Sequence, residues 1–443
     1  MLSLLLWAGC ATEPGADDSA SVQATLALTT GETVGSVVTV TWDVQGELSA
    51  LRIEYGVGDT LDRATTLEAP DAAGSTALYG LPYDVPVHAR LVGELADGRT
   101  FTTAAGAVRT DPAPTGVPAM TVSGAVAAWP GEFLVTNTVG ASFWVLALDS
   151  EGRVVWAWEP ELGEDEYIMR ARLAEEGDRF YVLVAHHGDT MEGSQNRILV
   201  RSLDGADLGT LDWPNADHDF VDLGGGTLAA IELVEVDGVW GDRIVERAPD
   251  GTRRIVWSAF DDTVLGEPVV NGQLGEWTHA NALDWVPEHD AYYVQLYLAH
   301  QFVRVRRIDG RADLHVHGDS GALRPVGGDP LGAAHQFQVL SENDFLHFEN
   351  GPADRASSRA VQFRADFESA TLETTWDLEA DPPLYVYAKG DVHRFPDGST
   401  QICWATSGRI DDYGPDGALD WSLSLELGSA LTYVQQVQQF GPR

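Results

Sequence analysis

Residues 396–404 read PDGSTQICW, a Pro-Asp-Gly turn followed directly by an apolar strand. The same arrangement, a tight turn and then an apolar strand, occurs five more times. The turns begin at residues 130, 174, 224, 287, 341 and 396, so successive starts are 44, 50, 63, 54 and 55 residues apart. A period of about 50 residues with four strands per unit is typical of a β-propeller, whereas two stacked sandwiches would not explain the regular spacing. Six turns predict an all-β fold with a six-bladed β-propeller at residues 121–443.

The region before the repeat has a different strand pattern. Apolar and polar residues alternate with period two in VTVTWDV (38–44), LRIEY (51–55) and VHARLV (87–92). Such alternation indicates strands with one buried face, and the whole pattern resembles fibronectin type III sandwiches. We therefore expect a small N-terminal β-sandwich at residues 22–109. The proline-rich stretch TDPAPTGVPAM (110–120) is the expected linker.

The first residues, MLSLLLWAGC, resemble a bacterial lipoprotein signal that ends at Cys10. The run is short and has no basic residues, so we expect the true start upstream. Residues 11–21 are typical of a flexible tether. If Cys10 is lipidated, Cys403 is the only other cysteine and no disulfide can form. The expected location is exported and lipid-anchored, on the periplasmic side of the outer membrane or on the cell surface, and Ala11 favours the outer membrane.

The composition excludes two broad classes of protein. The 443 residues carry 27 basic and 68 acidic side chains, so the net charge is 27 − 68 = −41, and Lys389 is the only lysine. A protein that binds nucleic acid electrostatically needs a basic face, so this class is excluded. A hydrophobic content of 44% with 14 Trp, 14 Phe and 12 Tyr excludes a disordered chain.

Three of the 12 histidines fall at one position of the repeat. His218 and His335 each lie six residues before a turn, and His279 lies eight before one. In a propeller the strand before each of these turns should be the innermost, so the three imidazoles should meet near the central axis. The residues alone leave two interpretations open: a metal site with three histidine ligands, or a catalytic cluster with a nucleophilic histidine and neighbours that bind an anion.

Four stretches together resemble the bacterial arylsulfate sulfotransferases, exported enzymes with a six-bladed propeller and an N-terminal sandwich. The similarity covers about residues 110–443, and its order and spacing are more specific than any one motif. The stretches are 218–220 (HDF), 277–285 (WTHANALDW), 334–351 with 358–361 (SRAV), and 390–398 (GDVHRFPDG) with 408–410 (GRI).

The resemblance implies a ping-pong sulfuryl transfer that uses no nucleotide sulfate donor and no cofactor or metal. A phenolic sulfate ester would give its sulfuryl group to His335, and a phenol would then accept it. His218 and His279 would contact the sulfuryl oxygens or protonate the leaving phenolate. Asn281 would donate its amide to an equatorial oxygen. The implied partners are therefore a small phenolic sulfate donor and a phenol acceptor.

One departure from the family pattern concerns the anion. Family members have an arginine at the end of the strand after the His-x-Asn stretch, but residues 295–301 read QLYLAHQ. His300 or Arg304 are the candidate replacements, and a missing guanidinium loses both charge and bidentate geometry. Three outcomes stay open: weak turnover, a different donor, or a non-catalytic surface binding propeller. A metal-dependent lyase or hydrolase on the histidine cluster is the remaining alternative.

Overall fold

The computed structural model describes residues 22–68, 70–124, 133–186, 195–268, 275–316, 323–326, 333–351, 356–426 and 428–441. Within these ranges the chain forms 34 β-strands and three short 3₁₀ helices, η1 (Ala259–Asp261), η2 (Pro287–His289) and η3 (Ala405–Ser407). No helix in the described ranges has the length and apolar character needed to cross a membrane. The chain divides into two compact units, Met1–Thr115 with Arg153–Trp158 and Leu203–Ala206, and Gly116–Gly152 with Glu159–Ser202 and Asp207–Arg443.

The first unit contains a β-sandwich of the fibronectin type III kind, as predicted. One sheet has the order β1-β2-β5, formed by β1 (Ala24–Thr30), β2 (Val38–Val44) and β5 (Ala73–Leu78). The other has the order β4-β3-β6-β7, formed by β3 (Leu48–Val57), β4 (Arg63–Leu67), β6 (Pro86–Leu95) and β7 (Thr100–Thr102), with β8 (Gly106–Arg109) also paired to β6. Every second residue of β2 is buried, which is the pattern of a strand with one face on a core.

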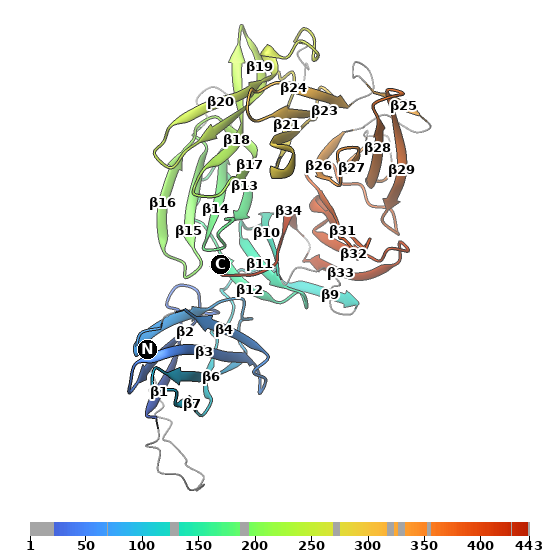
Figure 1. Cartoon of the computed structure of the whole chain (residues 1–443). Helices are drawn as coiled ribbons and strands as arrows, with labels where there is room; N and C mark the ends of the chain where they lie inside the picture. Colours follow the sequence, from blue (N-terminus) through green and yellow to red (C-terminus); the bar gives the residue numbers. More distant parts are fainter. Residues whose placement is uncertain are drawn as a thin grey trace. The chain divides into compact units, whose positions relative to one another are not determined.

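The strands from β9 to β34 form a six-bladed β-propeller (Figure 1). Each blade is one antiparallel sheet whose strands follow one another from the innermost outward. The first three blades are β34 (Ser429–Val437), β10 (Phe133–Gly140), β11 (Val145–Asp149), β12 (Val154–Trp158); β13 (Glu166–Leu173), β14 (Arg179–His186), β15 (Arg197–Ser202), β16 (Asp207–Asp212); and β17 (Ala216–Asp222), β18 (Leu228–Val236), β19 (Val239–Arg247), β20 (Arg253–Ser258). The others are β21 (Ala280–Val286), β22 (Ala291–Leu296), β23 (Gln301–Arg306), β24 (Ala312–Val316); β26 (Ala334–Val339), β27 (Asp344–Glu349), β28 (Arg359–Asp366), β29 (Thr371–Glu379), β25 (Arg324–Val326); and β30 (Asp391–Arg394), β31 (Thr400–Trp404), β32 (Arg409–Tyr413), β33 (Leu419–Leu425), β9 (Met120–Gly124). β25 adds to its sheet in the parallel direction. The six inner strands contact one another in a closed ring.

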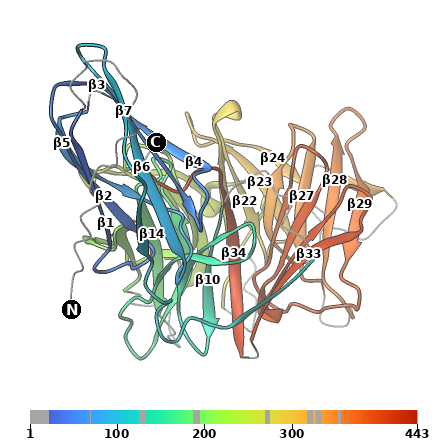
Figure 2. The same ribbon diagram turned by 90° about the horizontal axis from the view of Figure 1, so that it is seen from below.

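Both ends of the unit take part in closing this ring. β34 enters the first blade beside β10 (Figure 2), and β9 pairs with β33 at the outer edge of the last blade. The residues after the turn at 396 are therefore shared between two blades. Five of the six predicted turns follow an inner strand, as expected, whereas the turn at 130 lies outside the described residues and the strand before it, β9, is an outer one.

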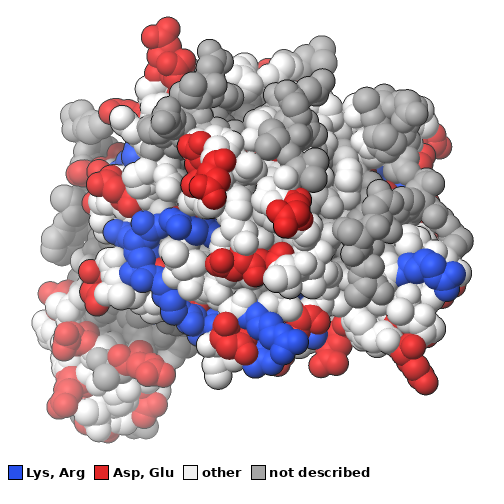
Figure 3. All heavy atoms as spheres, turned by 90° about the horizontal axis from the view of Figure 1, so that it is seen from above, with Lys and Arg blue, Asp and Glu red and all other residues white. Residues whose placement is uncertain are grey.

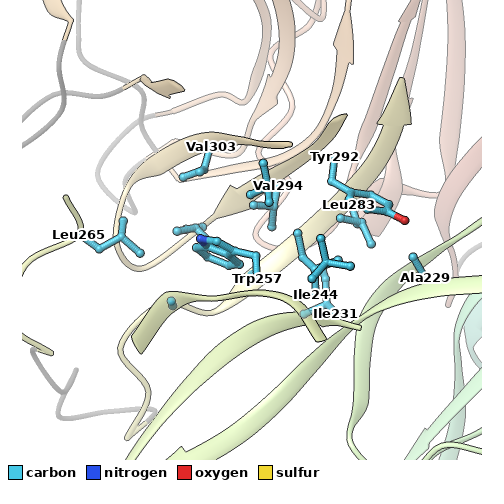
Figure 4. Packing of buried hydrophobic residues seen from close by; sticks show 14 of the residues in the cluster. Ala229, Ile231, Ile244, Trp257, Leu265, Leu283, Tyr292, Val294 and Val303 are labelled. Atoms are coloured by element: carbon cyan, nitrogen blue, oxygen red, sulfur yellow. The ribbon is translucent and has the colours of Figure 1, made fainter. Parts of the chain in front are cut away.

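Neighbouring blades pack through apolar faces. Ile231 and Ile244 of one blade meet Leu283, Tyr292 and Val294 of the next, and all five are buried (Figure 4). Burying one such side chain contributes about 1.5–3 kcal/mol of transfer free energy. This contact between blades fixes the spacing of the inner strands that carry the histidines.

The propeller axis holds a buried network of charges around Asp219, which is 0% exposed. Its Oδ1 accepts from Arg172 Nη2 at 3.0 Å, and its Oδ2 accepts from Gln336 Nε2 at 2.8 Å and from the Leu283 amide at 3.2 Å. Arg170 Nε lies 3.4 Å from the same carboxylate. One side chain of β17 therefore joins inner strands β13, β21 and β26.

The arginines at the blade edges are held by carboxylates. Arg243 Nη2 lies 2.7 Å from Glu232, and Arg254 and Arg307 lie 2.6 and 2.7 Å from Glu246. On the face seen in Figure 3, basic side chains form a short band bordered by acidic ones. Glu232 and Glu246 are both buried, so the arginines compensate carboxylates that would otherwise be left unpaired in the interior.

Candidate active site

The structure brings His218, His279 and His335 together, and we call these three the axial histidine cluster. The rings of His218 and His279 meet edge to face with centroids 4.5 Å apart. The ring of Tyr297 lies 5.6 Å from His279 and 5.5 Å from His335, and so links the two. Each histidine lies within three residues of the start of an inner strand, and these strands begin at the same end of the axis.

The regular pairing of each inner strand with its neighbour is interrupted close to the histidine. The register shifts between Asp217 and Phe220, between Ala280 and Ala282, and between Ala334 and Phe337. β-Bulges of this kind redirect side chains and are common beside active sites. His218 and His279 also have left-handed backbones, with φ of 54° and 48°. Such conformations cost about 1 kcal/mol each and cluster at functional sites.

His335 is neutral, and its tautomer follows from its partner. The amide of Asn350 donates from Nδ2 to the carbonyl oxygens of Val386 at 2.8 Å and of Lys389 at 2.9 Å. Its Oδ1 must therefore accept, and it faces Nδ1 of His335 in a hydrogen bond. The proton then sits on Nδ1, and Nε2 keeps its lone pair. Burial lowers the pKa of His335 to about 3, and the nearby charges of His218, His279 and Lys389 act in the same direction.

The other two histidines have carboxylate partners instead. Nδ1 of His218 lies 2.9 Å from Oδ2 of Asp217, and Nδ1 of His279 lies 2.5 Å from Oε2 of Glu276. Burial opposes charging His218, but Asp217 outweighs it, so the pKa of His218 lies above its ordinary value. The cluster thus combines a neutral imidazole, which can act as a nucleophile, with a neighbour that holds a proton, which can act as an acid.

Asp242 supports the strand start that carries His279. Its Oδ2 accepts from the Thr278 hydroxyl at 2.6 Å and from the Ala280 amide at 2.7 Å. Burial raises the pKa of Asp242 from 3.8 to about 7, and Glu276 and Asp217 add to this effect. Its contribution to stability is therefore complete below about pH 4 and is lost as the pH rises through 7.

Replacing Asp242 with asparagine should reduce the pH dependence of stability. Between pH 5 and pH 8 the free energy of unfolding should fall more in the wild-type protein than in Asp242→Asn, because only the wild type must ionise the buried carboxyl at position 242. Asparagine keeps an acceptor oxygen for Thr278 and Ala280. Urea unfolding at the two pH values measures the difference, and equal changes in both proteins would show that this carboxyl does not titrate as described.

The remaining predicted site residues lie in different surroundings. Asn281 is fully buried, and its Nδ2 donates to the Ala334 carbonyl at 2.9 Å, so it fastens β21 to the strand of His335. His300 is exposed, with φ of 50°, in the turn that also contains Tyr297. Arg304 does not reach the cluster, because β23 is the third strand from the axis and Nε of Arg304 donates to Asp313 at 2.7 Å. Cys10 lies outside the described residues.

Sequence reasoning missed the groups that set the protonation of the cluster. Asp217 directly precedes His218, and Glu276 lies three residues before His279, so the local sequence contained a signal for both. Asn350 is 15 residues from His335 and becomes its neighbour through the pairing of β26 with β27. The only feature of the sequence that distinguishes Lys389 is that it is the single lysine of the chain.

Fold and site together define a β-propeller protein with a histidine cluster on its axis. The chain is similar in fold to streptogramin B lyase (12% identity, 69% of this chain and 98% of that chain, TM-score 0.38). It is also similar to a catalytically inactive virginiamycin B lyase from Staphylococcus aureus with quinupristin (10%, 71% and 99%, TM-score 0.39) and to a protein from Lactobacillus plantarum (14%, 66% and 81%, TM-score 0.39). No protein-family model and no curated protein matches the chain. At these identities the likeness concerns the fold alone.

Proposed function

We propose that the protein is an aryl sulfotransferase that moves a sulfuryl group from a phenolic sulfate ester to a phenol through a sulfohistidine at His335. One observation carries the proposal: His335 is a buried neutral imidazole with its Nδ1 proton bound to Asn350, and it stands beside two histidines with carboxylate partners. A neutral imidazole is nucleophilic, and a covalent intermediate divides one difficult transfer into two easier steps.

In the first step the Nε2 lone pair of His335 attacks the sulfur of the ester. The bond between sulfur and the aryl oxygen breaks, and the aryloxide takes a proton from the charged form of His218 or His279 and leaves as a phenol. His335 then carries the sulfonate on Nε2 and still has its proton on Nδ1. The positive charge of this ring is stabilised by the acceptor oxygen of Asn350.

In the second step an acceptor phenol takes the place of the first product. Its oxygen attacks the sulfur, and its proton passes to the histidine that was deprotonated in the first step. The bond between sulfur and Nε2 breaks, and the electron pair returns to His335. The cluster ends in its starting protonation state, so no reductant, oxidant or cofactor is consumed.

Aromatic side chains near the cluster support an aryl substrate. Tyr297 lies between His279 and His335, and its pKa is raised by burial and then by the nearby Tyr385. The ring of Tyr385 is 39% exposed, so part of it is free to contact a ligand. Aromatic rings of this kind can stack on a phenyl group.

A metal-dependent lyase or hydrolase is the second candidate. Nδ1 of His279 and Nδ1 of His335 are each held by an oxygen acceptor, which is also the arrangement that orients metal-binding histidines. Against it, the ammonium of Lys389 acts on the same ring and would repel a dication. Within the described residues, no group of three or more His, Cys, Asp or Glu side chains is placed to hold a metal ion.

Acceptor-dependent transfer tests the proposal. With 4-nitrophenyl sulfate as donor, nitrophenol release should continue past one equivalent only when a second phenol is present, and that phenol should be recovered as its sulfate ester. Protein washed with chelator should keep this activity. Release that ignores the acceptor, or that is lost on chelation and restored by a metal, would support the metal enzyme, and no release at all would support a binding propeller.

A further inference from the structure

The only lysine of the chain is held close to the axial histidine cluster. Lys389 directly precedes Gly390 and β30, and its carbonyl oxygen accepts from the same Asn350 amide that binds His335. Its φ is 61°, a left-handed conformation that non-glycine residues rarely adopt. A Cβ on Gly390 would lie 2.1 Å from Cε1 of Phe348, so the backbone here packs directly on that ring. The position of Lys389 is therefore tightly determined.

The ammonium of Lys389 lacks the partner that other cations of this chain have. Among the described residues its Nζ forms no ion pair with a carboxylate, and its contact is a thioether, Sδ of Met169 at 3.8 Å. The rings of Tyr433 and Tyr167 lie 5.3 and 5.9 Å from Nζ. A thioether is a weak acceptor, so the three N–H groups are left with almost no hydrogen-bonding oxygen.

A second cation near Lys389, the guanidinium of Arg170, also lacks some of its hydrogen-bond partners. Arg170 is 3% exposed, and its Nε and Nη1 have no hydrogen-bond partner. Its nearest carboxylates, Asp219 and Asp391, lie at 3.4 and 3.8 Å. Burial, and then the charge of Arg170, lower the pKa of Lys389 to about 8. Buried cations without adequate partners favour an anionic ligand.

We infer that Lys389 binds the anionic group of the substrate, a tetrahedral sulfate, and holds its oxygens beside His335. This inference rests on the proposed function, because it assigns the sulfuryl oxygens to a named cation. It also supplies the cation that is missing from residues 295–301, where the chain has no arginine, and that Arg304 cannot provide because it is turned to Asp313. Arg170 adds to the positive potential at Lys389 but does not contact the sulfate.

The unique ε-amine allows a direct binding test on the full chain. Reductive methylation with ¹³C-formaldehyde labels Lys389 as the only lysine and preserves its charge. Titration with inorganic sulfate should shift this resonance saturably, and 4-nitrophenyl sulfate should compete. A resonance that does not respond to sulfate would overturn the inference, whether or not the protein proves to be a sulfotransferase.

Kinetics give the second, independent measurement. Lys389→Met should lower kcat/KM for 4-nitrophenyl sulfate by about 100-fold or more, which is the usual cost of losing one hydrogen-bond donor to an oxyanion, and Lys389→Arg should recover part of it. The matched control is Arg364→Met, which removes an exposed cation paired with Asp344 at 2.9 Å and should leave the rate unchanged. Wild-type rates in Lys389→Met would overturn the inference and leave the proposed function standing. Sulfate binding at Lys389 in a protein without turnover would support the anion site and reject the transferase.

Discussion

Replacement of His335 with alanine is expected to lower phenol-dependent transfer from an aryl sulfate by at least about 10⁴-fold, because it removes the atom that bonds to sulfur. The fold should survive. The change leaves Asn350 bound to the carbonyls of Val386 and Lys389, so only its Oδ1 loses a partner. Initial rates with 4-nitrophenyl sulfate and a phenol measure the effect, and urea unfolding shows whether the variant is folded.

A histidine elsewhere on the propeller serves as the control for this variant. His289 lies in η2, at the opposite end of the inner strand from His279, and its Nδ1 contacts the Tyr293 hydroxyl at 2.7 Å. His289→Ala should change the rate by no more than about twofold. Comparable rates for the two variants would mean that the imidazole of His335 takes no part in the chemistry.

Replacement of Asp219 with alanine is expected to cost about 3–5 kcal/mol of stability, since it leaves buried charges uncompensated. Arg172 and Arg170 would lose their nearest carboxylate, and Gln336 would lose an acceptor. These residues lie on different inner strands, so the damage should spread beyond one blade. Urea unfolding of wild-type protein and variant measures the difference.

Asp309 provides the comparison for Asp219. Its carboxylate is 46% exposed and pairs with Arg306 at 2.9 Å. Asp309→Ala should change the free energy of unfolding by less than about 1 kcal/mol, as exposed pairs do. Equal effects for the two carboxylates would show that the axial network is not a main source of stability.

Much of the fold was predictable because its information is local. Turns such as 224–226 and 396–398 and the apolar strands after them repeat at near-constant spacing, and that spacing specifies the number of blades. Closure of the ring was not predictable in the same way. β34 and β9 pair with strands far away in the sequence, and no local pattern signals this pairing.

The same distinction between local and long-range information applies to the candidate site. The meeting of His218, His279 and His335 follows from one residue per repeat, which the sequence displays. The partners that set their charge depend on bulges and register, as with Asn350 beside His335. Arg304 was misplaced for a related reason: distance along the chain does not show that β23 stands third from the axis.

The central claim, a covalent sulfohistidine, is tested most directly by mass. The full chain is incubated briefly with 4-nitrophenyl sulfate and no acceptor, and its intact mass is then measured. We predict a gain of one SO₃ group, about 80 Da, that maps to His335, is absent in His335→Ala, and disappears when a phenol is added. An unchanged mass without a burst of nitrophenol, or an adduct on another residue, would contradict the account.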